Sequence, residues 1–205
     1  MQAELSLSGT SGSAAGDPLS SNVRPHRKQR SVSDAVFSTE RLTVRRWRDS
    51  DLSTLLAVYG DADAMQWVGD GKPITHDECV RWFEVTRANY ATRGYGMFAV
   101  EATDAPAVIG FCGIVHPGGQ PEPEIKYAYL RTQWGRGYAT EAVAGLLRYG
   151  VRVHGLHQVI ATTAPANIAS HKVLLKAGMV RAELRVNDDG SSTQLFRWSA
   201  VAGAA

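Results

Sequence analysis

A glycine-rich turn at the start of a helix is the feature that most constrains how this chain folds. In residues 134–150, WGRGYATEAVAGLLRYG, two glycines flank an arginine, and apolar residues at helical spacing follow. Without side-chain bulk at Gly135 and Gly137, several backbone N–H groups would stand at the positive end of a helix that begins at about Tyr138. The stretch predicts either an anion-binding loop or a plain tight turn whose glycines take positive φ.

The spacing excludes two familiar phosphate-binding loops. The GxGxxG fingerprint of dinucleotide-binding proteins is absent, and no acidic residue ends a following parallel strand at the usual distance. No Gly-Lys-Ser/Thr sequence follows the turn, which excludes a nucleotide-binding P-loop. An anion site at this turn would therefore be of another kind.

Alternating strand and helix patterns from residue 38 onward predict the fold class. Apolar runs of strand length at 95–101 and 107–116 are separated by turn residues, so we expect an antiparallel hairpin. A last hairpin is expected at 179–186 and 194–198, around the NDDG turn. The other strands are expected at 41–47, 124–130 and 157–163, and the last helix at 167–178. This order predicts a mixed sheet with helices packed on it, an α+β or α/β sandwich.

Capping residues and apolar spacing place two helices after the first strand. Asp49 or Ser50 is the expected N-cap of the first helix. Thr75 should cap the second, with Glu78 as its capping-box partner and Gly94 as its C-terminal stop. The residues expected to face inward from the second helix are Val80, Phe83, Val85 and Tyr90.

The first 35 residues differ in composition from the rest of the chain. They are rich in Ser, Gly, Ala and Arg and hold few large apolar residues, so they cannot bury enough surface to offset the entropy of ordering. We therefore predict a disordered tail over 1–35 and one domain over 36–205. The RPHRKQR cluster of the tail is either a solvated basic segment or a contact for an acidic partner such as ribosomal RNA.

Charge and cysteine content argue against several functional classes. A net charge of +2 is too balanced to indicate nucleic acid or a membrane surface as a partner. Cys79 and Cys112 both lie inside patterned segments, which argues against a disulfide framework or a cysteine metal site. No apolar run approaches the length of a membrane span, and the N-terminus lacks the order of a signal peptide. We expect a cytoplasmic protein with no metal.

Two stretches of the chain resemble one known enzyme family. EIKYAYLRTQWGRGYATEAVAGLLRYG, residues 124–150, and APANIASHKVLLKAGM, residues 164–179, resemble the GNAT acyltransferases, in the branch that includes bacterial N-acetyltransferases of ribosomal-protein N-termini. The resemblance covers about residues 38–198. It implies a mixed, mostly antiparallel sheet of about seven strands, flanked by about four helices and splayed between the parallel strands 124–130 and 157–163. It also implies acetyl-CoA as the cosubstrate.

The resemblance assigns the pyrophosphate of acetyl-CoA to the glycine turn. The family's loop, Gln/Arg-x-x-Gly-x-Gly/Ala, maps onto residues 134–139, with Trp134 in place of the usual first residue. Asn167 matches a family position that touches the cosubstrate, and it also suits the N-cap of its helix. The candidate cosubstrate-binding residues are Trp134, Gly135, Arg136, Gly137, Tyr138, Ala139, Thr140 and Asn167.

The resemblance leaves the proton donor for the leaving thiolate unassigned. Many GNAT enzymes use a tyrosine in the helix after their fifth strand, but that position is Leu174 here. Ser170 lies within one turn of it and could orient a water molecule or the thiol. The alternative for Ser170 is a helix serine that bonds back to the backbone.

Glu124 is the candidate general base, because a carboxylate partly buried beside an apolar strand can have a raised pKa. The alternative is a strand-end charge in solvent. His116, at the end of the neighbouring strand, is the rival base or a structural histidine. Tyr127 and Tyr129 share one face of their strand and are interpreted as packing residues.

The acceptor amine should enter under the two early helices. Trp67 and Asp70 in the connecting segment could hold a cationic substrate, or Trp67 could simply fill the core. The expected function is transfer of an acetyl group to a primary amine, on a protein N-terminus or a small molecule, by a monomer or homodimer. The alternatives are a non-catalytic acyl-CoA-binding module and a nucleic-acid-binding protein led by its basic tail.

Overall fold

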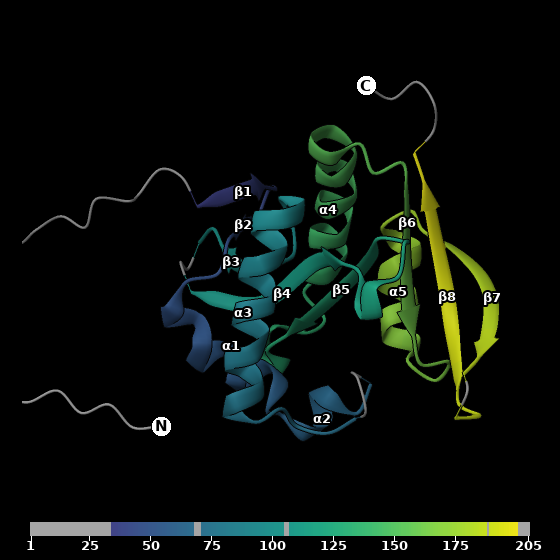
Figure 1. Ribbon diagram of the computed structural model, residues 1–205, viewed down its shortest axis with the longest axis horizontal. Helices are drawn as coiled ribbons and strands as arrows, with labels where there is room; N and C mark the ends of the chain where they lie inside the picture. Colours follow the sequence, from purple (N-terminus) through teal and green to yellow (C-terminus); the bar gives the residue numbers. More distant parts are fainter. Residues whose placement is uncertain (1–33, 68–70, 105–106, 188, 201–205) are drawn as a thin grey trace, which may run out of the picture. The chain divides into compact units, whose positions relative to one another are not determined.

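A computed structural model describes residues 34–67, 71–104, 107–187 and 189–200 (Figure 1). Most of the expected tail lies outside these residues, although its last residue, Ala35, already begins a strand. Within the described residues, eight strands form one sheet in the order β1-β2-β3-β4-β5-β6-β8-β7. The strands are β1 (Ala35–Ser38), β2 (Leu42–Arg45), β3 (Met97–Ala102), β4 (Val108–Val115), β5 (Glu124–Tyr129), β6 (Gln158–Thr163), β7 (Val180–Val186) and β8 (Ser192–Ser199).

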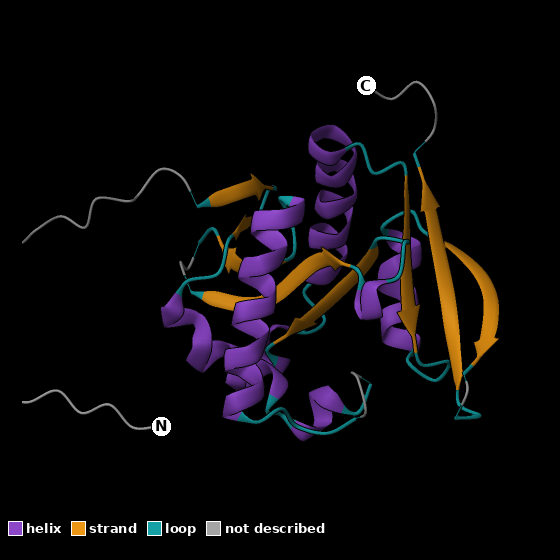
Figure 2. Ribbon diagram, viewed as in Figure 1, coloured by secondary structure: helices purple, strands orange, loops and turns teal. Residues whose placement is uncertain are grey.

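Helices pack on both faces of this sheet. They are α1 (Leu52–Tyr59), α2 (Ala62–Met65), α3 (His76–Arg93), α4 (Tyr138–His154) and α5 (Ile168–Lys176). Figure 2 shows α4 and α5 in the half of the domain that holds β5 and β6, and they contact these two strands respectively. The mixed sheet with packed helices is therefore confirmed, with β1 and the short α2 as elements that the sequence pattern did not predict.

Alternation along the strands divides the core into two clusters. Phe98 and Cys112 belong to a cluster that includes residues of α4 and α5, whereas their neighbours Ala99 and Phe111 belong to a cluster with α1, α2 and α3. Successive side chains of a strand point to opposite faces of a sheet. The two clusters therefore lie on the two faces, so α1, α2 and α3 cover the face opposite to α4 and α5.

The strands β5 and β6 separate soon after they meet. All other neighbouring strands are antiparallel, but these two run parallel and pair at a single position, Glu124 with Ile160. By contrast, β5 pairs with β4 along its whole length, from Glu124 to Tyr129. Figure 1 shows β5 and β6 diverging from this point. The predicted splay between the two parallel strands is confirmed, and it leaves backbone groups of both strands without ladder partners beyond Glu124.

Local signals placed α3 correctly. Thr75 is its N-cap and accepts a hydrogen bond from the N–H of Glu78, whose side chain reaches back to the N-cap backbone. Gly94 ends the helix in the left-handed conformation, with φ 79°. The predicted capping box and glycine stop are therefore both confirmed.

The predicted inward face of α3 is confirmed at Phe83 and Tyr90 and wrong at Val80 and Val85. Val80 and Val85 are 39% and 59% exposed, whereas Cys79, Phe83 and Thr86 are buried. Residues spaced by four and three positions from Phe83 form the stripe that faces the sheet, as helical geometry requires. The two valines are more apolar than Thr86 but lie off this stripe, so hydrophobicity alone misplaced these two positions.

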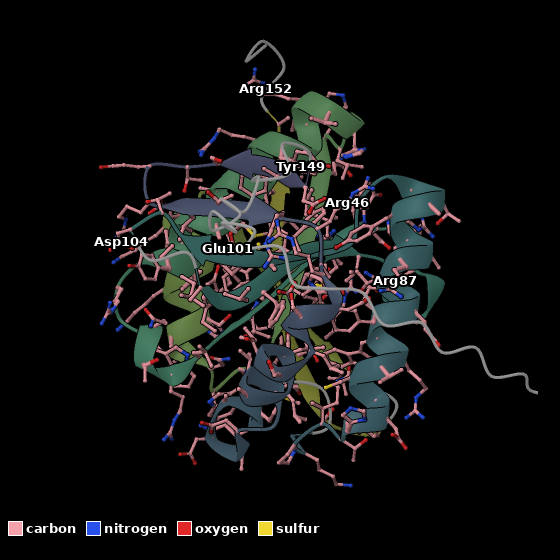
Figure 3. All side chains as sticks on the ribbon, turned by 90° about the vertical axis from the view of Figure 1, so that its left-hand side faces the viewer. Arg46, Arg87, Glu101, Asp104, Tyr149 and Arg152 are labelled. Carbon is pink, nitrogen blue, oxygen red and sulfur yellow. The ribbon has the colours of Figure 1, made fainter. Side chains whose placement is uncertain are left out.

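The predicted N-cap of α1 is also wrong. Asp49 and Ser50 lie in a 3₁₀ turn, and α1 begins at Leu52 after Asp51. Asp51 is buried and accepts two hydrogen bonds from the guanidinium of Arg45, at 2.7 and 2.9 Å. Arg45 also pairs with Glu101, which is labelled in Figure 3. The first acidic residues of this segment therefore serve tertiary ion pairs, and Asp49 itself pairs with Arg87.

Candidate active site

The glycine turn lies between the end of β5 and the start of α4, as predicted. Gly135 and Gly137 take the left-handed conformation, with φ 76° and 80°, which confirms the tight turn. Gly137 is also the N-cap of α4, and no side chain caps the helix there. The first amides of α4 therefore have no intrahelical acceptor and point out at the positive end of the helix dipole.

The space beside the turn fits an approaching anion. A Cβ atom at Gly135 would meet nothing within 4 Å, and one at Gly137 would meet Arg41 Nη2 at 3.5 Å. Trp134 fastens the turn, because its Nε1–H donates to the carbonyl oxygen of Tyr129 at 2.9 Å. The other loop candidates, Arg136, Tyr138, Ala139 and Thr140, lie together at the start of α4. A phosphate group suits this set of amide donors and glycines. Contact with the cosubstrate stays a prediction.

Arg41 lies against the same turn, although nothing in the sequence pattern singles it out. Its Nη1 donates to the carbonyl oxygen of Arg136 at 3.0 Å, and its guanidinium lies over the ring of Tyr138, 4.9 Å from the centroid. Its Nε donates to Glu141 Oε2 at 2.7 Å. Arg41 and Glu141 are 100 residues apart in the chain, so no local sequence pattern indicates this contact. A second positive charge is therefore held beside the amides of the turn.

Glu141 fixes Arg41 in place. Thr39 Oγ1 donates to its Oε1 at 2.5 Å, and the backbone N–H of Arg41 donates to the same atom at 2.9 Å. Partial burial works to raise the pKa of Glu141, but the hydrogen bonds from Thr39 and Arg41 bring that pKa below its ordinary value. The charged carboxylate therefore ties the connection between β1 and β2 to the first turn of α4.

Glu124 is buried, with 2% of its surface exposed, so the alternative of a strand-end charge in solvent is wrong. Thr162 Oγ1 donates to its Oε1, and Gln120 Nε2 donates to its Oε2 at 3.2 Å. Lys126 Nζ lies 2.5 Å from Oε1 and forms an ion pair with it. The carboxylate thus lies at the one position where β5 and β6 pair, with three partners that orient it.

His116 uses both of its ring nitrogens in structural contacts. Nδ1 is 2.9 Å from the carbonyl oxygen of Gln120, which can only accept, so Nδ1 carries the hydrogen. Nε2 is then the acceptor for the hydroxyl of Tyr95, at 2.9 Å. The side chain of Gln120 in turn donates to Glu124, so His116 supports the loop that orients the candidate base. This geometry favours the structural role of His116 over its role as a base.

Asn167 and Ser170 form the first turn of α5. Asn167 is the N-cap, and its Oδ1 accepts from the N–H of Ser170 at 3.0 Å, which confirms the expected cap. The hydroxyl of Ser170 is 2.6 Å from the hydroxyl of Tyr127 on β5, so it does not bond back to the helix as the alternative required. Burial raises the pKa of Tyr127 to about 12, although the hydrogen bond with Ser170 opposes this. Leu174, one turn later, is fully buried in the core.

The candidate groups lie on opposite faces of β5. Tyr127 packs against the cluster with α4 and α5, whereas Ala128 and Leu130 pack against the cluster with α1, α2 and α3. By strand alternation, Glu124 and Lys126 share the second face. The carboxylate of Glu124 and the hydroxyls of Tyr127 and Ser170 therefore lie on opposite faces of the sheet, where β5 and β6 separate.

The expected acceptor segment is only partly described. Trp67 is 40% exposed, so it does not fill the core, and Asp70 lies outside the described residues. Arg131, in the turn after β5, forms ion pairs with Asp61 and Asp63 at the start of α2. These pairs fasten α2, and so the segment that carries Trp67, to the end of β5.

No cluster of three His, Cys, Asp or Glu side chains suited to a metal ion occurs among the described residues. Across that same part of the chain, each helix is too short or too polar to cross a membrane.

Comparison with other proteins gives matches to one family. Residues 41–180 match the family described as Acetyltransferase (GNAT) domain. A Bacillus subtilis (strain 168) protein named Uncharacterized N-acetyltransferase YnaD is 28% identical over 145 residues, covering 71% of this chain and 82% of that protein.

Solved structures of acetyltransferases share the fold. An acetyltransferase (GNAT family) from Bacillus anthracis superposes with a TM-score of 0.68 at 23% identity, covering 79% of this chain and 96% of the other. A spermidine N-acetyltransferase from Vibrio cholerae, solved in complex with CoA and spermine, gives a TM-score of 0.65 at 17% identity, covering 78% and 96% of the two chains. At these identities the likeness concerns the fold alone.

Proposed function

The chain belongs to the GNAT acetyltransferase family and is an acetyl-CoA-dependent acyltransferase, and from this premise we propose that it acetylates a primary amine by direct attack within a ternary complex. One observation carries the proposal: the open glycine turn that begins α4 directly follows β5, the strand that separates from β6. A phosphate-binding turn at this position would continue directly into a row of unpaired backbone groups, which suits a long cosubstrate with a phosphate end and an amide-containing arm.

The cosubstrate acetyl-CoA supplies an activated acetyl group, and this chain's residues bind and orient it. The amides of about residues 136–140 would hold the pyrophosphate, with Arg136 and Arg41 as nearby positive charges. Unpaired backbone groups of β5 and β6 beyond Glu124 would bond the amides of the arm. Asn167 is the N-cap of α5, the helix that follows β6. Bound in this way, the reacting carbon is aligned for attack.

Glu124 is the proposed general base. An alkyl amine is mostly protonated at neutral pH and must lose a proton before it can attack. The carboxylate of Glu124 is buried at the closed end of the divergence, where its partners Thr162 and Gln120 fix its orientation. It can accept the proton directly or through a water molecule.

Ser170 is the proposed donor to the departing thiolate, with Tyr127 behind it. The two hydroxyls are hydrogen-bonded on the face of the sheet opposite to Glu124. With acetyl-CoA bound between β5 and β6, a proton donor would stand on one side of the reacting carbon and a base on the other. Leu174, where other family members carry a tyrosine, is fully buried and offers no such group.

The acceptor is a primary amine, on a protein N-terminus or a small molecule, that enters past Trp67 and Asp70. Arg131 holds α2 against the end of β5, and α2 packs on the face of the sheet that Glu124 shares. We further propose a cytoplasmic monomer or homodimer whose domain begins with Ala35, the first residue of β1, with the preceding residues as a tail and with no part for nucleic acid, membrane or metal.

Release of free thiol from acetyl-CoA, measured with a panel of primary amines, tests the function. The proposal expects release that depends on one class of amine, with one acetylated product per thiol identified by mass. Tight binding of acetyl-CoA without release for any amine would instead favour a non-catalytic acyl-CoA-binding module.

A further inference from the structure

We propose that Lys126 is a site of self-acetylation, in which its own Nζ attacks the thioester and Glu124 takes up the proton. The inference rests on the proposed function, since it requires acetyl-CoA between β5 and β6. It adds a modification site that the reaction with an external amine does not need.

The contacts of Lys126 place its amine at the reacting end. Nζ lies 2.5 Å from Glu124 Oε1 and donates to Thr162 Oγ1 on β6 at 3.1 Å. Lys126 and Thr162 each follow, by two positions, the last paired residues of their strands, Glu124 and Ile160. The lysine side chain therefore bridges β5 and β6 just where they begin to separate.

An arm that enters from the glycine turn and runs along β5 would reach toward this bridge. From Tyr129, next to the turn, to Glu124 the strand spans about 17 Å, at roughly 3.3 Å per residue. The arm would run along β5 toward its closed end, so its thioester arrives beside the groups gathered there. Lys126 is the amine bonded to the proposed base at that end, and 41% of its side chain is exposed, which leaves it room to turn toward the thioester.

The chemistry balances without any further reactant. The Lys126 ammonium gives one proton to Glu124, which passes it to solvent, and the free Nζ forms a bond to the acetyl carbonyl carbon. The carbon–sulfur bond breaks, and the second proton lost by nitrogen ends on the departing thiolate. The products are an acetyl-lysine amide and free CoA. Because an amide is a poor acyl donor, this product is an end point and no intermediate of turnover.

The modification would change the surroundings of the base. An acetylated lysine carries no charge, so Glu124 would lose the cation that lies 2.5 Å from its Oε1. Thr162 and Gln120 would remain as its hydrogen-bond donors. The surroundings of Glu124, where the acceptor amine must approach, would thereby become less positive.

The test follows acetylation of the purified full chain by acetyl-CoA without added amine, with sites mapped by peptide mass spectrometry. Lys126 should acquire the acetyl group about a hundredfold faster than Lys172 and Lys176, which are exposed on α5. The rate constant should not depend on protein concentration, because the reaction is intramolecular. The intact chain should gain one acetyl group, and Lys126→Arg should abolish this gain while the matched variant Lys176→Arg keeps it.

Two further variants examine the step itself. Glu124→Gln should slow acetylation of Lys126 by about a hundredfold. Gly137→Val should slow acetylation of Lys126 to the extent that a smaller fraction of the protein has acetyl-CoA bound. Acetylation of Lys126 no faster than of Lys172 and Lys176, or at an unchanged rate in Glu124→Gln, would overturn the inference. If turnover with an added amine persists in that case, the inference alone fails; if turnover and binding are absent too, the proposed function fails with it.

Discussion

The hydroxyl of Tyr127 on β5 lies 2.6 Å from the hydroxyl of Ser170 in the first turn of α5. This contact joins a strand and a helix that are 43 residues apart in the chain, and it lies on the face of the sheet opposite to Glu124. The sequence pattern indicated packing for Tyr127, but the contact gives its hydroxyl a partner at the proposed site.

Tyr127→Phe removes this hydroxyl and keeps the ring. We expect the rate of acetyl transfer to fall about tenfold while the affinity for acetyl-CoA stays unchanged, because Ser170 loses the group that orients it. Ser170→Ala should have at least as large an effect, because it removes the proposed donor itself, and the double variant should be little slower than Ser170→Ala, since Tyr127 acts through that hydroxyl. Single-turnover rates measure all three. Additive losses would show that the two hydroxyls act independently.

Gly137→Val should weaken the binding of acetyl-CoA at least about tenfold, because a branched side chain would stand where the pyrophosphate approaches the amides. Gly155→Val is the matched control, since Gly155 also has positive φ, 64°, and lies at the other end of α4. Both variants carry similar backbone strain, but only the first stands at the turn. Calorimetric titration of the folded variants decides: equal affinities would contradict the phosphate-binding turn.

Arg41→Gln should also weaken acetyl-CoA binding, by about threefold to tenfold, because the turn loses both its contact at Arg136 and a nearby positive charge. Arg48→Gln serves as the control. Arg48 has nearly the same exposure, 45% against 46%, and also pairs with one carboxylate, that of Asp34. The difference in affinity should shrink at high salt, since it is partly electrostatic. An equal loss of acetyl-CoA affinity in Arg41→Gln and Arg48→Gln would show that Arg41 has no specific role in binding.

His171 should make the fold less stable as the pH falls. Burial lowers the pKa of its imidazole, and the charge of Arg181 adds to this against the opposing hydrogen bond to Ala164. Below about pH 6.5 the unfolded chain therefore binds a proton that the folded chain resists, so the free energy of unfolding decreases with decreasing pH. Burial lowers the pKa of His154 as well. His171→Gln should therefore reduce only part of the dependence of the free energy of unfolding on pH. Urea unfolding of both proteins at about pH 7.5 and 5.5 measures this dependence. An equal loss of stability in His171→Gln and in the unaltered protein would contradict the role of His171.

The sequence predicted those parts of the fold that local interactions decide. Thr75 and Glu78 cap α3 from positions three residues apart, and the hairpin of β3 and β4 follows from two apolar runs and a short turn. The predicted cap of α1 failed because Asp49 and Ser50 lie in a 3₁₀ turn before the helix begins at Leu52, and Asp49 pairs with the distant Arg87. On α3 the predictions for Val80 and Val85 failed, because the polar residue Thr86 faces the core instead.

The candidate site also has a part that local sequence predicts and a part that it does not. The glycine turn is visible in the sequence because its conformation depends on Gly135 and Gly137 themselves. The partners that complete the site are distant in the chain: Glu141 is 100 residues from Arg41, and Thr162 is 36 from Lys126. Sheet topology brings these pairs together, and a single sequence carries no local signal for them.

The central claim is that Glu124 removes the proton of the acceptor amine. Glu124→Gln keeps the shape of the side chain but cannot accept a proton, so acetyl-CoA affinity should barely change. His116→Gln is the control, because both nitrogens of His116 are held in structural hydrogen bonds.

The deciding measurement is the rate constant for acetyl transfer in both variants as a function of pH. The account predicts a fall of about a hundredfold or more for Glu124→Gln near neutral pH, with partial recovery toward the pKa of the amine, and only a few-fold change for His116→Gln. Wild-type rates for Glu124→Gln over that pH range, together with loss of turnover in His116→Gln, would contradict it.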